Sequence, residues 1–305
     1  MSTPDDPGRN RVRELAVERD RAGQRLDNYL ARELGPVPRA LVYRLIRTGQ
    51  VRVNGGRAKP MRKLAAGDRV RIPPVRTGGA PPARLPAERV DEIAGRIIHR
   101  QAEFIVVDKP AGIASQAGSG LAWGLNDLVA RIEPNALPVH RLDRETSGVM
   151  LFALGRANAV ELQRLFRDNR VEKRYLALLD GHLDHDLVEV DRPLKKIRDA
   201  GGRHRVVVDE EGQPARSRFR VLKRLPRHDY VEVEIETGRT HQIRAHARFL
   251  GAPIAGDDRY NPGQPPSGLK RLFLHAASLR LPWPEDQVFS APLPDELDQV
   301  LEALR

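Results

Sequence analysis

The sequence predicts an α+β protein, in which a small basic α+β unit precedes a larger domain with a mixed, largely antiparallel sheet flanked by helices. The chain has 305 residues, of which 40% are hydrophobic, so it is long enough for one small and one large core. Strand-like and helix-like stretches alternate without the regular βαβ order of a parallel sheet. Residues 230–235 alternate apolar and acidic side chains, which is typical of a sheet with one face in water.

The small unit is expected at 21–76, after a flexible tail at 1–20 whose charged sequence contains Pro4, Pro7 and Gly8. Gly35-Pro36 separates two amphipathic helices, and Asn54-Gly55 is a strong hairpin signal. The expected helices and strands of this unit are 25–34, 38–48, 51–53 and 68–72.

The net charge of the chain is concentrated in the small unit. Residues 1–80 hold 18 Lys and Arg against 8 Asp and Glu, whereas residues 81–305 hold 34 against 33. A genomic preference for arginine would explain why Arg outnumbers Lys, but it does not explain why acidic residues fail to balance the basic ones at this end only. Such a concentration favours binding of a polyanion and predicts a nucleic-acid partner.

The larger domain is expected at 95–305, after a linker at 77–94 that begins within a stretch rich in Pro, Gly and Ala. Its expected strands and helices alternate irregularly, and Thr240 is a plausible cap for the last helix. The expected strands are 97–98, 104–107, 148–153, 173–179, 219–222 and 230–235, and the expected helices are 157–167 and 240–250.

Several classes of chemistry find no support in the sequence. There is no cysteine, no apolar run of transmembrane length and no apolar stretch in residues 1–25 that could act as a secretory signal, so we expect a cytoplasmic protein. His241 and His246 are five residues apart, which does not fit a zinc pair on one helix face. No phosphate-binding glycine motif is present. We therefore expect no metal and no cofactor, and a monomer by default.

Three segments carry candidate chemistry. Residues 140–148, HRLDRETSG, form a polar segment before a buried strand, where Asp143 suits either a turn cap or catalysis. Tyr175 lies on an apolar strand, EKRYLALL, where most tyrosines are core residues. In TGRTHQIRAHARFL, Arg244 and Arg248 are four apart and are expected on one helix face. That face suits a solvated surface, a phosphate clamp or a partner for a buried carboxylate.

At these segments the sequence resembles the RluA family of pseudouridine synthases. HRLDRETSG fits the family's catalytic-aspartate motif, and the other family motifs follow in the expected order, so the resemblance covers roughly residues 95–305. The N-terminal unit resembles the S4-like RNA-binding domain, and its residues 25–60 and 66–76 are similar to the RluC branch, which modifies large-subunit ribosomal RNA. The matching segments after residue 148 are KRYLAL, GRTHQIRAH, GAPIAGDDRY and RLFLHAASL.

The resemblance implies a role for each candidate residue. Asp143 would be the catalytic carboxylate, Arg244 the cation that keeps it ionised, and Tyr175 would pack on the flipped uracil. Arg141 would fill the space left by the extruded base, since unstacking costs a few kcal/mol. The remaining residues expected in the site are Ile243, as an apolar wall, with His140 and Thr146 at the substrate. The expected phosphate-binding residues are Arg44, Arg47, Arg52 and Arg57.

The partner implied is large-subunit ribosomal RNA or a pre-ribosomal particle. Two alternatives remain open from the sequence. A non-catalytic RNA-binding or ribosome-assembly factor would explain the basic unit equally well. A pseudouridine synthase acting on transfer RNA would share the same chemistry.

Overall fold

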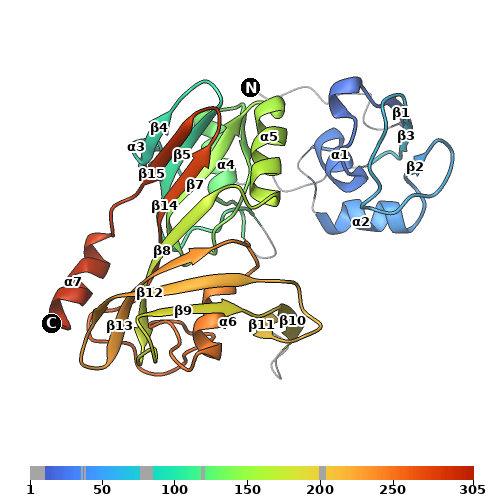
Figure 1. The fold of residues 1–305 in the computed structure, drawn as a ribbon. Helices are drawn as coiled ribbons and strands as arrows, with labels where there is room; N and C mark the ends of the chain where they lie inside the picture. The colour runs from blue at the N-terminus through green and yellow to red at the C-terminus, as the bar shows by residue number, and fades with distance from the viewer. Residues whose placement is uncertain (1–10, 36, 38, 76–84, 118–120, 199–203) are drawn as a thin grey trace. The chain divides into compact units, whose positions relative to one another are not determined.

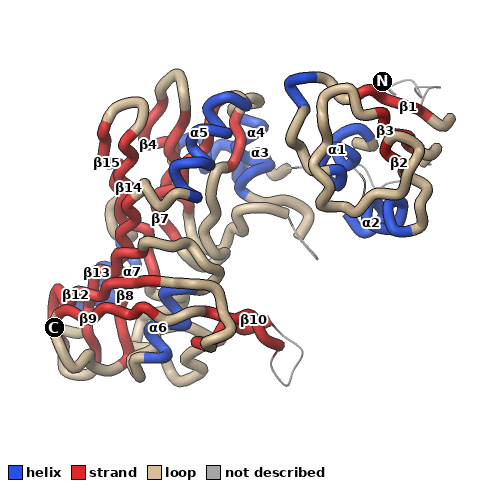
Figure 2. Tube along the Cα trace, turned by 45° about the vertical axis from the view of Figure 1, so that its right-hand side comes forward, coloured by secondary structure: helices blue, strands red, loops and turns tan. Residues whose placement is uncertain are grey.

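The computed structural model describes residues 11–35, 37, 39–75, 85–117, 121–198 and 204–305 (Figures 1 and 2). Contacts divide the chain into two compact units, Met1–Arg84 and Leu85–Arg305, and each is described by itself. Pro36, the first half of the expected tail and the first part of the expected linker lie outside the described residues.

The N-terminal unit packs two helices against a three-stranded sheet. The strands lie in the order β1-β3-β2, and both pairs are antiparallel. Asn54 and Gly55 both have positive φ, 51° and 76°, as the predicted tight turn requires. The elements are β1 (Arg13–Ala16), a 3₁₀ turn (Arg19–Arg21), α1 (Leu26–Glu33), α2 (Arg39–Arg47), β2 (Arg52–Val53) and β3 (Arg69–Ile72).

The expected tail at 1–20 extends too far into the folded unit. Strand β1 pairs along its whole length with β3, and Leu15 and Val17 pack into the core of this unit. Glu14 and Ala16, which alternate with these two apolar side chains, are exposed, so the segment is a half-buried strand although its composition is typical of a tail.

The C-terminal unit is built on one large sheet, and the prediction of a mixed, largely antiparallel sheet is confirmed. The described residues place ten strands in it, in the order β4-β5-β7-β14-β8-β13-β12-β9, with β6 on β7 and β15 on β14. Among these strands only β7 and β14 pair in parallel. The strands are β4 (Ile97–Arg100), β5 (Phe104–Lys109), β6 (Ala136–Pro138), β7 (Ser147–Leu154), β8 (Glu172–Asp180), β9 (Leu187–Asp191), β12 (Arg216–Arg224), β13 (His228–Ile235), β14 (Leu274–Pro282) and β15 (Asp286–Ser290), and the separate hairpin is β10 (Leu194–Arg198) with β11 (His204–Val208).

The parallel pair is a seam where two antiparallel halves of the sheet meet. Ser147 and Gly148 of β7 lie opposite His275 and Ala276 of β14. Gly148 has a φ of 113°, and a Cβ at this position would lie only 2.2 Å from the carbonyl oxygen of Ala276. Only glycine permits this approach, so residue 148 fixes how closely the start of β7 meets β14.

Helices cover both faces of the first half of the sheet (Figure 1). Alternate residues of β5 and β7 pack into two different cores, one with α5 and one with α3 and α4, as the two-residue period of a strand requires. Helix α6 packs on the second half. No helix in the described ranges is long and apolar enough to cross a membrane. The helices are α3 (Ala87–Gly95), α4 (Leu125–Ile132), α5 (Arg156–Arg167), α6 (Gln242–Phe249) and α7 (Asp295–Ala303).

Two expectations about helices are corrected. The expected linker at 77–94 contains most of α3, whose Ile93 is fully buried in the core beside α4. Its first residues are rich in Pro and Ala, and this composition concealed the amphipathic pattern that follows. Thr240 does not cap α6, because the helix begins two residues later and His241, in a left-handed conformation, is the residue before it.

Candidate active site

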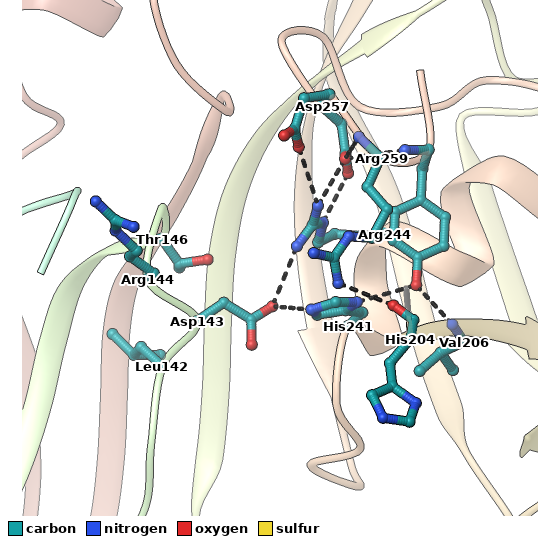
Figure 3. A network of polar contacts seen from close by, with 12 residues as sticks. Leu142, Asp143, Arg144, Thr146, His204, Val206, His241, Arg244, Asp257 and Arg259 are labelled. Carbon is teal, nitrogen blue, oxygen red and sulfur yellow. Dashed lines mark hydrogen bonds and ion pairs between the residues drawn. The ribbon is translucent and has the colours of Figure 1, made fainter. Parts of the chain in front are cut away.

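An open pocket of about 540 Å³ brings together residues from three distant parts of the chain. Asp143 lies in the loop that leads into β7, Tyr175 lies on β8, and Arg244 lies on α6. Figure 3 shows Asp143 reaching from its loop toward His241 and Arg244. The pocket thus lies beside the parallel seam, where the loop before β7 meets the neighbouring strands.

Buried polar side chains fix the loop that carries Asp143. Ser115 Oγ donates to the carbonyl oxygen of Leu142 at 2.6 Å and accepts from the Leu142 amide at 3.0 Å. The ammonium of Lys109, which is fully buried, donates to three carbonyl oxygens, those of Pro110, Arg144 and Thr146, at 2.8, 3.1 and 2.7 Å. Burial lowers the pKa of Lys109 to about 7, while the nearby negative charges oppose this shift. These bonds hold the backbone on both sides of residue 143.

The Asp143 carboxylate faces two nitrogen groups. Its Oδ2 lies 3.7 Å from Arg244 Nη1 and 3.7 Å from His241 Nε2, and 19% of the side chain is exposed. Arg244 makes a bidentate pair with Asp257 through Nε and Nη2, at 2.7 and 2.6 Å. Burial opposes the charge of Arg244, but the hydrogen bonds and charge of Asp257 outweigh it and raise the pKa of the guanidinium. One nitrogen of a fixed cation therefore remains directed at Asp143.

Tyr175 forms part of an apolar side of the pocket. Its strand neighbours are Val233 on β13 and Ala276 on β14, and the pocket is also lined by Ile243 and Leu274. Burial raises the pKa of the Tyr175 phenol, and the charge of Asp143 raises it further, so the hydroxyl stays protonated at neutral pH. A flat uncharged ring would find an aromatic and aliphatic surface here, within the same pocket as a carboxylate.

The start of α6 is held by one glutamine side chain. Gln242 Oε1 accepts from the Arg239 amide at 3.0 Å and from Thr237 Oγ1 at 2.7 Å, while Nε2 donates to the Arg216 carbonyl oxygen and to Ser217 Oγ. All four hydrogen-bonding capacities of this buried amide are thus used. The clamp fixes the turn that precedes the helix and determines which residues of α6 face the pocket.

The structure brings most of the predicted site residues to the pocket. Arg244 is buried and Arg248 is exposed, so the helix face that their four-residue spacing gives them is covered at residue 244 and open to solvent at residue 248, close to the end of the helix. Six predicted residues line the pocket: Arg141, Asp143, Thr146, Tyr175, Ile243 and Arg244.

His140 is not among the residues that line the pocket, and its placement at the substrate is corrected. Its Nε2 accepts a hydrogen bond from the Leu151 amide at 2.9 Å, and its ring stacks on Phe166 with centroids 4.5 Å apart. Burial against β7 and α5 lowers its pKa to about 3, so the ring is neutral. His140 therefore anchors the chain where it bends into the loop that carries Asp143.

Sequence analysis missed four residues of this network: Lys109, His241, Asp257 and Tyr260. A signal existed for Asp257 and Tyr260, because both belong to the GAPIAGDDRY segment that matched the family. His241 lay inside a segment already singled out, but a helix assumed to begin at Thr240 gave no reason to direct its ring at Asp143. Nothing in the local sequence pattern distinguished Lys109 from a lysine at the end of a strand.

The four arginines predicted to bind phosphate are all exposed in the N-terminal unit. Within the described residues, none of them lies within ion-pair distance of a carboxylate, whereas most exposed arginines of the large sheet do pair. Arg52 donates to the Gly55 carbonyl oxygen at 3.1 Å. Their charges are thus available to a polyanion. These residues are Arg44, Arg47, Arg52 and Arg57.

Comparison with known proteins agrees with this site. The sequence model of the RNA pseudouridylate synthase family matches residues 103–249, and that of the S4 domain matches residues 24–70. The chain belongs to the RNA pseudouridine synthase family and carries an S4 domain at its N-terminal end. The resemblance stated from the sequence motifs is confirmed.

Several relatives match this chain over nearly its whole length. The chain is 39% identical to "Ribosomal large subunit pseudouridine synthase C" of Vibrio vulnificus, over 97% of this chain and 98% of that protein. It is 40% identical to the protein of the same name from Escherichia coli K12, over 96% and 97%. Among solved structures, human RNA pseudouridylate synthase domain containing 4 is 26% identical, with a TM-score of 0.61, over 71% of this chain and 95% of that one.

Proposed function

We propose that this enzyme converts specific uridines of large-subunit ribosomal RNA to pseudouridine, with Asp143 as its catalytic carboxylate. The names of full-length relatives support the RNA class. The observation that carries the residue assignment is the position of Asp143: a partly buried carboxylate on a rigid loop, 3.7 Å from a fixed arginine, in a pocket that Tyr175 also lines.

The reaction requires a carboxylate at the sugar. The bond between N1 and C1′ breaks, the uracil turns, a bond between C5 and C1′ forms, and the proton on C5 is lost while N1 gains one. Asp143 can assist as a nucleophile at C1′, or as a base that stabilises a cationic sugar. In both routes it must be ionised when the bond breaks, and Nη1 of Arg244 places a positive charge 3.7 Å from its Oδ2.

Tyr175 would support the uracil while it is detached. Its ring and the side chain of Ile243 offer apolar contacts inside the pocket, and its phenol is protonated at neutral pH. The target base can reach this pocket only if it leaves its helix, which costs a few kcal/mol. The exposed side chain of Arg141 lies at the same pocket and would enter the vacated space in the RNA.

The assignment of Asp143 is tested by release of tritium from RNA labelled at C5 of uridine. Asp143→Asn should abolish turnover while the variant still folds and binds RNA. Asp184→Asn is a matched control, because the same substitution is made at an exposed carboxylate that does not line the pocket. Turnover by a folded Asp143→Asn variant at the wild-type rate would contradict the proposal.

The S4 domain would position the ribosomal RNA, or a pre-ribosomal particle, through its unpaired arginines. Replacing Arg44 and Arg47 with glutamine should weaken RNA binding and lower the salt slope by roughly 0.7–0.9 for each phosphate that is no longer neutralised. Arg218→Gln is the control, since Arg218 already pairs with Glu189 at 2.8 Å. Salt slopes that are equal in all three proteins would contradict a phosphate-binding role for these arginines.

The RNA target is tested by mapping pseudouridines in a strain that lacks the gene. Loss of modification in large-subunit ribosomal RNA is the expected result, and loss confined to transfer RNA would refute the ribosomal assignment. We also propose that the enzyme acts as a monomer in the cytoplasm, where ribosomal subunits assemble. Light scattering at the protein concentration of the activity assay measures whether the enzyme is a monomer.

A further inference from the structure

His241 occupies a strained position between two polar groups (Figure 3). Its φ is 53°, in the left-handed region that non-glycine residues rarely adopt. Its Nδ1 lies 3.0 Å from Tyr260 Oη, and its Nε2 lies 3.7 Å from Asp143 Oδ2. Strain of this kind persists only where the surroundings hold it, and here it directs the ring at the carboxylate.

The hydrogen bonds of Tyr260 determine where the proton of His241 lies. The Val206 amide donates to Tyr260 Oη at 2.9 Å, so the phenol already accepts one bond. Tyr260 is 1% exposed, and among the described residues its only other polar partner is His241 Nδ1. A buried hydroxyl hydrogen needs an acceptor, so the phenol donates to Nδ1, and that nitrogen carries no hydrogen.

We propose that Tyr260 holds His241 as the neutral tautomer whose Nε2–H faces the Asp143 carboxylate. His241 is then a positioning residue for the isomerisation, and Tyr260 sets the location of its proton. This inference rests on the proposed catalytic role of Asp143. A neutral donor orients the carboxylate without adding a second positive charge beside it, so Asp143 keeps the electron density that its reaction requires.

The charges around the ring favour the neutral form. The pKa of His241 is lowered to about 4, chiefly by burial and in smaller part by Arg244 and Arg259, whereas Asp143 and Asp257 oppose this shift. The phenol acts in the same direction, because a proton on Nδ1 would leave the Tyr260 hydroxyl without an acceptor. His241 is therefore uncharged at pH 7.

Two other buried histidines of this unit show the same arrangement. In both, Nε2 faces a backbone carbonyl oxygen, which can only accept, so Nε2 carries the hydrogen and a serine hydroxyl donates to Nδ1. At His241 a tyrosine replaces the serine and a carboxylate replaces the carbonyl. The distance of 3.7 Å is longer than in those cases, and hydrogen bonds in empty active sites often tighten when substrate binds. The partners are Ser217 and Arg192 for His246, and Ser147 and Ala291 for His275.

The tautomer is measured directly by nitrogen NMR of the full-length protein labelled in histidine. At pH 7 we expect His241 to show a protonated Nε2 and a bare Nδ1, with its signals assigned by their loss in His241→Gln. Tyr260→Phe should shift the Nδ1 signal toward the protonated form. Tyr230→Phe, at a partly buried tyrosine of the same unit, should leave it unchanged. A protonated Nδ1 in the wild type, or signals unaffected by Tyr260→Phe, overturns the proposal.

Activity tests the function of the donor. His241→Gln keeps an N–H group that can reach Asp143, and His241→Leu has none, while both carry the same backbone strain. We expect kcat of the leucine variant to be about 10- to 100-fold below that of the glutamine variant, with a smaller change in KM. Equal kcat values in two folded variants overturn the proposal.

Failure of this inference is distinguishable from failure of the proposed function. If Asp143→Asn is inactive but the two His241 variants turn over equally, only the role of His241 is refuted. If Asp143→Asn is active, the catalytic assignment is refuted, whereas the tautomer seen by NMR is independent of that result.

Discussion

Lys109 predicts a measurable dependence of stability on pH. Burial lowers its pKa in the folded protein to about 7, whereas the unfolded chain has the ordinary value of 10.5. Between these values the unfolded state binds more protons, so the free energy of unfolding rises with pH over this range. Below about pH 7 it levels off, because both states are then protonated. One proton of difference between the two states changes the free energy of unfolding by about 1.36 kcal/mol for each pH unit. Integrated from pH 7 to pH 9, the Lys109 contribution raises the free energy of unfolding by about 2 kcal/mol.

The assay is urea unfolding at several pH values, followed by tryptophan fluorescence, because Trp123 and Trp283 both lie in the C-terminal unit. Other groups also titrate, so the gain is measured as the difference between the wild type and Lys109→Met, which lacks the titrating group. The variant should be less stable at every pH and should lack this part of the slope. Parallel curves for the two proteins would show that the three carbonyl acceptors hold the proton of Lys109 as firmly as water does, and would refute the reasoning.

Two further predictions concern Gly148, at the seam between β7 and β14, and the buried ion pair between Arg244 and Asp257. Gly148→Ala should destabilise the C-terminal unit by about 4 kcal/mol or more, because its Cβ would lie 2.2 Å from the Ala276 carbonyl oxygen. Gly155 also has a positive φ, but a Cβ there would meet open space. Gly155→Ala should therefore cost only about 1–2 kcal/mol in the same urea titration. Similar losses would refute a role for steric contact at the seam. Asp257→Asn should lower the free energy of unfolding by about 3–5 kcal/mol and reduce kcat, because it breaks the buried pair with Arg244. A stable and fully active variant in the tritium assay would contradict this.

Local pattern predicted little more than half of the helices and strands that the structure describes, because the burial of those elements follows the period of a strand or a helix. It predicted no element at α4 or α7, nor at β6, β9, β10, β11, β14 and β15. The strand at 230–235 alternates and lies in β13, and the apolar run at 148–153 lies in β7, which is buried on both faces. The apolar pattern also failed to predict β1 and α3, because it is short and lies in a segment whose overall composition is charged or rich in proline. In those elements, tertiary contacts made by a few apolar residues outweigh the charged or proline-rich sequence around them.

The site was less predictable than the fold, because its geometry depends on two local departures from regular structure. The left-handed conformation at His241 moves the start of α6 to residue 242, so a helical wheel begun at Thr240 cannot say what the imidazole ring faces. The chain bends at His140, and the ring of that residue contacts β7 and α5 although it lies only three residues before Asp143. Neither departure leaves a signature in residue type alone, whereas the family motif already pointed to Asp143 and Arg244.

The charges of the pocket explain how a polyanion can approach a catalytic carboxylate. At the inner side, Arg244 carries one positive charge between the carboxylates of Asp143 and Asp257, so these three groups together carry one net negative charge. At the outer side, Arg141 and Arg239 line the same pocket with exposed side chains. Phosphates of the RNA are therefore attracted to the rim, while the uncharged uracil is the part that can approach Asp143 without repulsion. A lone arginine without Asp257 would instead draw a phosphate into the pocket, so the buried pair favours the base over the backbone at the catalytic position.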